Sequence, residues 1–174
     1  MPMRQPYGFT LIEILIVVAV IAVLAATVLP QFASSTEDAK QSALEYNVKV
    51  LREQAQIYQA HHLGDLPTIQ DNDLPQLTGA TNVHGEIGEP GDSYPLGPYV
   101  NESLPLNPFD ESNKVTPVAV PGQKPTKAVG SLGGWQYDES NGAVWPNHAG
   151  YYASGGGALA EVEAEAKLEG PSTP

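Results

Sequence analysis

The chain has 174 residues, of which 8 are basic and 20 acidic, so its net charge is −12 at neutral pH. Because phosphate binding needs clustered Lys and Arg, this charge argues against nucleic acid as a partner. The sequence has no cysteine, which excludes disulfides, zinc–thiolate sites and thiol catalysis. Aliphatic residues are concentrated in the first 30 positions. The globular core must therefore be small, and we expect neighbouring chains to contribute to its stability.

An apolar run extends over residues 9–29 and contains one charged residue, Glu13. As a helix it would reach roughly 30 Å, which is the thickness of the hydrocarbon core of a bilayer. Arg4 precedes the run, and the next basic residue is Lys40. This asymmetry predicts a single-pass membrane segment with its N-terminus in the cytoplasm.

The residues alone leave three interpretations of this segment open. A secretory signal peptide could be cleaved near residues 23–26, but its apolar centre is normally shorter than this run. A plain membrane anchor explains the length, but it leaves Glu13 as a cost of about 2.5–3.5 kcal/mol at mid-membrane, and less near the interface. The third interpretation is a segment that later leaves the lipid for an assembly.

Residues 8–13, Gly-Phe-Thr-Leu-Ile-Glu, precede an aliphatic run that ends at Pro30. This pattern closely resembles the N-terminus of type IV pilins and type II secretion pseudopilins. The resemblance implies that a prepilin peptidase cleaves between Gly8 and Phe9 on the cytoplasmic face and methylates the new N-terminus. Residues 1–8 would then be a removable leader.

The resemblance also implies a role for Glu13 in assembly. Cleavage creates an ammonium group at Phe9, and the Glu13 carboxylate of one subunit would neutralise the Phe9 ammonium of a neighbour in a filament. Removing one member of a buried ion pair costs about 3–5 kcal/mol, so the pair would act mainly to set the register of assembly.

The helix is predicted to continue over residues 30–63. Pro30 lacks an amide hydrogen, so we expect the helix to kink or loosen there. Beyond it, side chains recur at spacings of three and four residues and form one buried stripe. The stripe consists of Leu44, Val48, Leu51, Ala55, Tyr58 and His62. Gly64 and Pro67 predict the end of the helix near Leu63.

Residues 64–150 predict a small β domain with many turns. The clearest element is a hairpin of residues 135–138 and 143–146, because Asn-Gly between two aromatic-bearing segments is a strong hairpin signal. Weaker strand candidates are residues 98–100 and 114–118. On the first hairpin strand, Trp135 and Tyr137 share one face, which we expect to pack on the helical stripe.

The remaining segments suggest no catalytic or metal site. Residues 151–174 are rich in Gly, Ala and Glu and are predicted to be an acidic disordered tail. The four histidines lack the spacing of a metal site, and His61 and His62 are expected to contact the helix-end dipole. We expect no cofactor. Many major pseudopilins end in a Ser-Gly-Asp-Gly-type loop that binds calcium, but this sequence lacks that run, so a structural calcium would need other ligands. The oxygen donors for it would be Asp110, Glu111, Asn113 and Asp138.

We therefore predict a pilin-like α+β fold: a long N-terminal helix with a membrane-spanning first half, packed on a small antiparallel sheet. By resemblance, the protein would be a structural subunit of a periplasmic pseudopilus of a type II secretion-like system. Its partners would be copies of itself, other pseudopilins, the prepilin peptidase and an inner-membrane assembly platform, with the C-terminal domain in the periplasm. The alternatives are a surface type IV pilin for adhesion, motility or DNA uptake, and an unrelated membrane-anchored domain or secreted enzyme.

Overall fold

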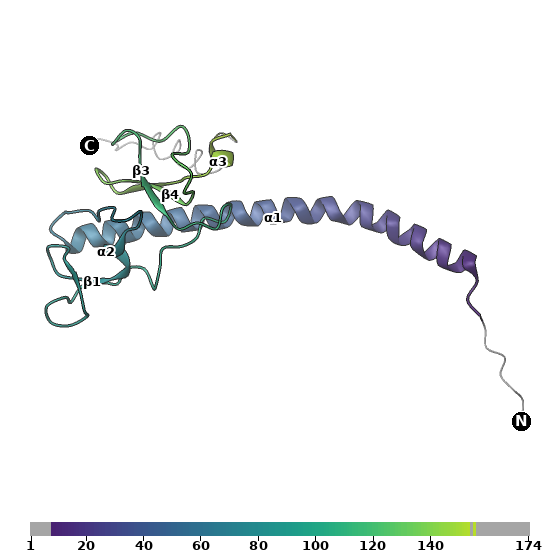
Figure 1. Cartoon of the computed structure of the whole chain (residues 1–174), viewed down its shortest axis with the longest axis horizontal. Helices are drawn as coiled ribbons and strands as arrows, with labels where there is room; N and C mark the ends of the chain where they lie inside the picture. The colour runs from purple at the N-terminus through teal and green to yellow at the C-terminus, as the bar shows by residue number, and fades with distance from the viewer. Residues whose placement is uncertain (1–7, 154, 156–174) are drawn as a thin grey trace, which may run out of the picture. The chain divides into compact units, whose positions relative to one another are not determined.

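The computed structural model describes residues 8–153 and 155, without the side chains of residues 27–35. The elements, shown in Figure 1, are α1 (Leu11–His61), α2 (Pro75–Thr78), β1 (Ala80–Thr81), β2 (Ile87–Gly88), β3 (Val115–Pro117), β4 (Trp135–Asp138), β5 (Ala143–Pro146) and α3 (Ala149–Ala153). Helix and sheet together make an α+β chain, as predicted. It divides into two compact units, and the division falls between Ala39 and Lys40.

In the first unit, the backbone of α1 stays helical through Pro30. A proline inside a helix removes one backbone hydrogen bond, and here the helix continues on both sides of it. The kink predicted at Pro30 stays a prediction. Among the described residues, no helix is both long enough and apolar enough to cross a membrane. The membrane-spanning role predicted for residues 9–29 is therefore not confirmed.

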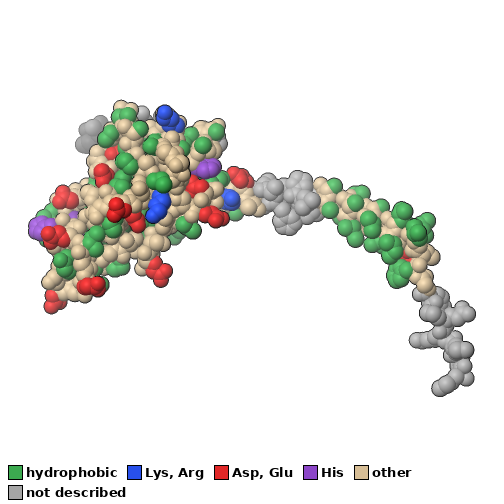
Figure 2. Space-filling model, viewed as in Figure 1, with side chains coloured by type: hydrophobic (Ala, Val, Ile, Leu, Met, Phe, Trp, Pro, Cys, Tyr) green, Lys and Arg blue, Asp and Glu red, His purple; other side chains and the backbone are tan. Residues whose placement is uncertain are grey.

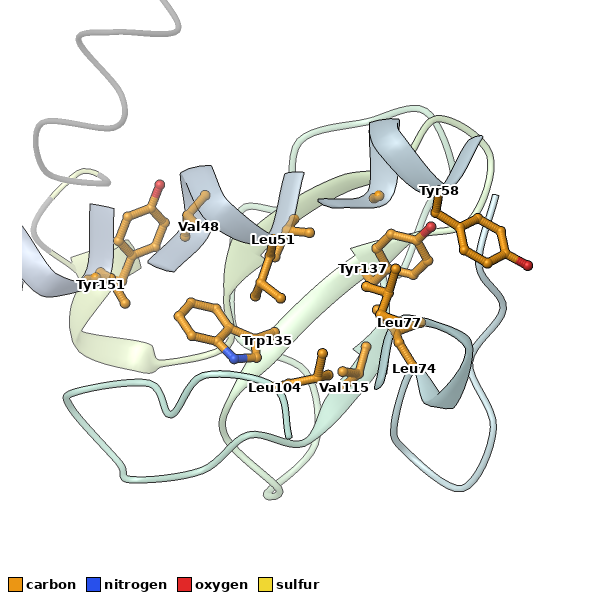
Figure 3. Close-up of a cluster of buried hydrophobic side chains, with 13 residues drawn as sticks. Val48, Leu51, Tyr58, Leu74, Leu77, Leu104, Val115, Trp135, Tyr137 and Tyr151 are labelled. Carbon is orange, nitrogen blue, oxygen red and sulfur yellow. The ribbon is translucent and has the colours of Figure 1, made fainter. Parts of the chain in front are cut away.

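In the second unit, the predicted stripe of α1 forms one side of the core. All six of its side chains are at most 1% exposed. Trp135 and Tyr137 of β4 are equally buried and belong to the same hydrophobic cluster as Leu51 and Tyr58, as Figure 3 shows. The packing of the first hairpin strand on the helical stripe is thus confirmed.

Helix α1 ends at His61, two residues before the boundary predicted from the stop signals. His62 follows it and is fully buried, and its ring stacks on Tyr58 with 3.6 Å between the centroids. Its Nδ1 lies 2.8 Å from the Tyr58 carbonyl oxygen, and its Nε2 lies 3.0 Å from Oγ1 of Thr81. The expected contact with the helix end is present, and the same ring also links α1 to β1.

The predicted hairpin is confirmed, because β4 and β5 pair antiparallel with Asp138 opposite Ala143. The prediction of a wholly antiparallel sheet is wrong, since β3 pairs parallel with β4 in the order β3-β4-β5. A parallel pair needs a connection long enough to return the chain to the starting end of the sheet, and residues 118–134 provide it. A separate small sheet is formed by β1 and β2, which pair antiparallel.

Residues 98–100 do not form the expected strand. The amides of Tyr99 and Val100 both donate to the carbonyl oxygen of Leu77, at 2.8 and 2.9 Å, at the end of α2. In a β-strand successive amides point to opposite sides, so two neighbouring amides that donate to one acceptor do not belong to a strand.

Parts of two predicted segments lie outside the described residues, namely residues 1–7 of the leader and residue 154 with residues 156–174 of the acidic tail. The tail prediction is wrong at its start, because Tyr151 lies in α3 and is 4% exposed. Tyr151 packs in the core, and this apolar contact holds the end of the domain in place.

Candidate functional site

The predicted processing and assembly residues lie at the start of α1. Gly8, Phe9 and Thr10 precede the helix, and Glu13 lies in its first turn. Oγ1 of Thr10 accepts a hydrogen bond from the Glu13 amide at 3.3 Å. In return, Oε2 of Glu13 accepts from the amide and the hydroxyl of Thr10, each at 3.3 Å. This reciprocal pattern is a capping box, which satisfies amides that have no partner within the helix.

Thr10 is the residue of this site that the sequence reasoning missed. The signal was present, because Thr-Leu-Ile-Glu over residues 10–13 has the spacing of a capping box. The structure brings Glu13 to Thr10, the residue that follows Phe9. The pairing of Glu13 with Phe9 of a neighbouring subunit involves a second chain and stays a prediction.

The predicted cleavage junction is open. A Cβ atom added at Gly8 would have no atom within 4 Å, so the fold does not require a glycine at this position. The side chain of Phe9 is 80% exposed. An enzyme that recognises Gly8 and Phe9 would therefore meet no steric obstacle from the described residues.

The segment from Phe9 to Leu24, which includes the start of α1, exposes large apolar side chains on all sides. They are between 49% and 83% exposed, and Figure 2 shows hydrophobic side chains covering the visible face of this segment. They are Phe9, Leu11, Ile12, Ile14, Leu15, Ile16, Val17, Val18, Val20, Ile21, Val23 and Leu24. A contiguous apolar surface of this kind marks a site of contact with another protein or with a membrane.

The carboxylates considered for calcium hold turns in this chain. Asp110 accepts hydrogen bonds from the amides of Ser112 and Gly134, and Asp138 accepts from those of Gly122 and Ser140. Within the described part of the chain, no three His, Asp or Glu side chains are grouped so that they could hold a metal ion. Calcium binding stays an untested prediction.

Comparison with known proteins identifies the class to which this N-terminal segment belongs. The family model for the prokaryotic N-terminal methylation motif matches residues 3–29. The chain is also similar to type II secretion system core protein G of Pseudomonas aeruginosa, with 40% identity over 58 residues. That alignment covers 33% of this chain and 41% of the relative, so the similarity spans less than half of either protein. No solved structure matches the chain.

These two matches support a pilin or pseudopilin type for the N-terminal segment. Members of this family are structural subunits rather than enzymes. The cleavage motif, the acid at Glu13 and the exposed apolar helix all lie within the matched residues. This segment is therefore the candidate functional site.

Proposed function

We propose that this chain is a structural subunit of a periplasmic pseudopilus in a type II secretion-like system. Copies would assemble through the N-terminal part of α1, and the growing filament would drive the export of other proteins. A separate cytoplasmic ATPase would supply the work. The match to a type II secretion core protein favours this system over a surface filament.

The observation that carries the proposal is the exposed apolar surface between Phe9 and Leu24. Burying one such side chain against a neighbouring copy stabilises the contact by about 1.5–3 kcal/mol. Within this surface Glu13 is the only acid, and its carboxylate is available at the end where cleavage would create an ammonium group. A parallel stack of copies would place that ammonium near the Glu13 of a neighbour.

The partners follow from this role. A prepilin peptidase would cleave after Gly8, and an inner-membrane assembly platform and other pseudopilins would incorporate the mature chain. Before assembly the protein would be held at the inner membrane, with its N-terminus in the cytoplasm and the second unit in the periplasm. After assembly it would belong to the periplasmic filament.

Processing is checked by mass spectrometry of the protein isolated from its membrane fraction. We expect a chain that begins at Phe9 and carries one methyl group on its amine. A chain that retains residues 1–8 in a host with an active prepilin peptidase would contradict the proposal. A chain cleaved near residues 23–26 would instead identify an ordinary signal peptide.

Assembly is tested with two neighbouring substitutions. Glu13→Ala removes the carboxylate, and we expect both filaments and export to be lost. Thr10→Ala is the matched control, because it weakens the helix cap by about 1 kcal/mol and keeps the carboxylate. It should preserve both activities. Electron microscopy of overproduced filaments and an export assay in a deletion strain are the measurements.

Each outcome of this pair is informative. Unimpaired filaments with Glu13→Ala would refute assembly through this acid. Equal losses in the two variants would show that Glu13 acts only as a helix cap. Filaments on the surface of cells that make the protein, together with normal export in the deletion strain, would favour the alternative, a type IV pilin.

A further inference from the structure

A polar pocket of about 420 Å³ lies where the end of α1 meets the β4–β5 turn. This volume is within the range of small-ligand pockets, about 300–1,000 Å³. Two exposed acids, Asp65 and Glu139, line the pocket, and no Lys or Arg of the described residues does. Oε1 of Glu139 accepts a hydrogen bond from the Ile69 amide at 2.6 Å, which holds that side chain in place. The pocket therefore attracts positive charge.

Tyr58 of α1 forms the inner end of this pocket. The residue is 1% exposed, and its ring stacks on His62 and meets the edge of Tyr99, with 5.5 Å between the centroids. Figure 3 shows its hydroxyl pointing away from the other labelled core side chains. A Cβ atom at Gly85 would collide with this hydroxyl and would lie 3.0 Å from Nε2 of Gln76, which also lines the pocket. The hydroxyl of Tyr58 thus lies among the polar groups of the pocket.

This hydroxyl has no hydrogen-bond partner among the described residues, and it is not one of the unpartnered polar atoms that are fully enclosed. A partner can therefore reach it from the pocket. Gln76 differs, because its Oε1 accepts from the Thr68 amide at 2.7 Å and its Nε2 donates to the Gly85 carbonyl at 2.9 Å. Within the described part of the chain, Tyr58 is the buried polar side chain of this pocket that still needs a partner.

The chemistry of these groups defines the ligand. Burial, Tyr99 and Asp65 raise the pKa of Tyr58 to about 12, so its hydroxyl is uncharged at neutral pH and its oxygen can accept a hydrogen bond. The carboxylates of Asp65 and Glu139 accept as well. An alkylammonium group has one positive charge and three N–H donors, which matches these three acceptors.

A metal ion fits this pocket less well. Calcium needs at least six oxygen ligands within about 2.3–2.6 Å of one point. Among the described residues, no three His, Asp or Glu side chains are grouped closely enough to hold a metal ion. Leu66 also lines the pocket and gives it an apolar wall. Such a wall suits the methylene groups that carry an ammonium and offers nothing to a metal ion.

We propose that this pocket binds an alkylammonium group, which donates to Asp65, Glu139 and the hydroxyl of Tyr58. Its methylene groups pack on Leu66. Such a group belongs either to a free organic cation or to a lysine of another copy of the chain. All the residues of the pocket come from one chain, so the proposal does not rest on the proposed function.

A titration of the full chain in neutral detergent micelles tests this proposal. The probe is n-butylammonium at constant ionic strength and about pH 8, above the ordinary pKa of imidazole, because His84 also lines the pocket. In ¹H–¹⁵N spectra we expect the amides of Gly64, Asp65, Glu139 and Ser140 to shift together and to saturate with one Kd. The isomer tetramethylammonium has the same charge but no N–H group, and it should bind about threefold more weakly or worse.

Four substitutions separate this pocket from the general acidity of the chain. Asp65→Asn and Glu139→Gln each remove one charge and keep the shape of the side chain, and each should raise the Kd about threefold. Tyr58→Phe removes only the unpartnered hydroxyl, so it should raise the Kd and leave the circular dichroism spectrum unchanged. Asp92→Asn is the matched control, since it removes an exposed acid outside the pocket, and the Kd should stay the same.

Protein dilution without added cation distinguishes the two sources of the ammonium. Shifts of the same amides that grow with protein concentration would assign the group to a lysine of another copy. Spectra that do not change with protein concentration would assign the pocket to a free cation.

Four results would overturn the proposal. The first is a set of shifts that never saturates, and the second is equal affinity for the two isomeric cations. The third is a loss of affinity with Asp92→Asn as large as that with Asp65→Asn. The fourth is an unchanged Kd with Tyr58→Phe.

Discussion

Glu13 is placed so that one carboxylate can serve two groups in turn. In the single chain it accepts hydrogen bonds from the amide and hydroxyl of Thr10, both at the long distance of 3.3 Å. An ammonium carries a full positive charge, which at about 4 Å attracts a carboxylate by about 1 kcal/mol in water and by more where water is excluded. Under the proposed assembly, the ammonium of a neighbouring Phe9 would therefore compete effectively with Thr10. The capping box would hold the carboxylate near the N-terminus until that partner arrives.

A second carboxylate, that of Asp138, links the β4–β5 turn to the connection after β3. Burial raises its pKa, but hydrogen bonds from Ser140, Gly122 and Asn141 outweigh burial, so the pKa of Asp138 lies below its ordinary value. Because the pKa is lower in the folded than in the unfolded chain, the ionised carboxylate stabilises the fold. This contribution is fully present above about pH 4 and is lost as the pH falls through the folded pKa.

We expect Asp138→Asn to lower the free energy of unfolding by about 1 kcal/mol at pH 7. The difference from the unchanged protein should shrink below about pH 4, as the pH falls toward the lowered pKa of Asp138 in the folded chain. Urea unfolding of the full chain in micelles, followed by circular dichroism at pH 7 and pH 3, measures it. The exposed Asp92 provides the control, since Asp92→Asn should leave stability unchanged at both pH values. A difference that stays constant with pH would contradict this account.

Among the elements, β3 depends on a close approach of two backbones. Gly134 has φ of 71° and precedes β4, and the Trp135 amide donates to the Lys114 carbonyl at 2.8 Å. A Cβ atom at Gly134 would collide with that carbonyl oxygen and lie 2.8 Å from the Lys114 nitrogen. Strand β3 can therefore join the sheet in this register only when residue 134 has no side chain.

Gly134→Ala should destabilise the protein more than Gly130→Ala does. Gly130 has a similar φ of 67° but open space around it, so its substitution costs only the left-handed conformation, about 1–2 kcal/mol. At Gly134 the collision with Lys114 adds to that cost, and we expect at least twice the loss. Urea unfolding compares the two variants. Equal losses of stability in the two variants would show that the chain relieves the collision with Lys114 at no cost.

The sequence predicts those elements whose signals are local. The stripe from Leu44 to His62 follows from helical spacing, and the β4–β5 hairpin follows from its Asn-Gly turn. The direction of β3 could not be predicted, because it depends on the path of the connection over residues 118–134. The strand predicted at residues 98–100 is wrong, because the amide of Tyr99 donates to the carbonyl oxygen of Leu77, which is distant in sequence. At the site, Gly8, Phe9 and Glu13 were identified from their motif, whereas the capping role of Thr10 was overlooked.

For the whole molecule, the excess of 20 acidic over 8 basic residues restricts the partners it can attract. A filament repeats this charge with every subunit, and a polyanion would be repelled along its length. Proteins bind nucleic acid largely because their Lys and Arg side chains displace counterions from the phosphates, and this chain has too few of them. A role in DNA uptake by direct contact is therefore disfavoured.

Filaments of this protein should not retain double-stranded DNA, even at about 50 mM salt, where electrostatic binding is strong. A filter-binding assay with a basic DNA-binding protein as the positive control measures this. Retention that decreases steeply with added salt would contradict the expectation and would favour a surface filament that takes up DNA.

The open space around Gly8 separates the requirement for a stable fold from the requirement for recognition by an enzyme. In many proteins one residue must meet both. Since no neighbouring atom restricts this position, the stability of the domain imposes no selection on it. Under the proposed processing, any constraint on residue 8 would come from the peptidase that cleaves after it. If the proposed function holds, substitutions there would accumulate a well-folded precursor, and a defect in export would arise without any loss of folded protein.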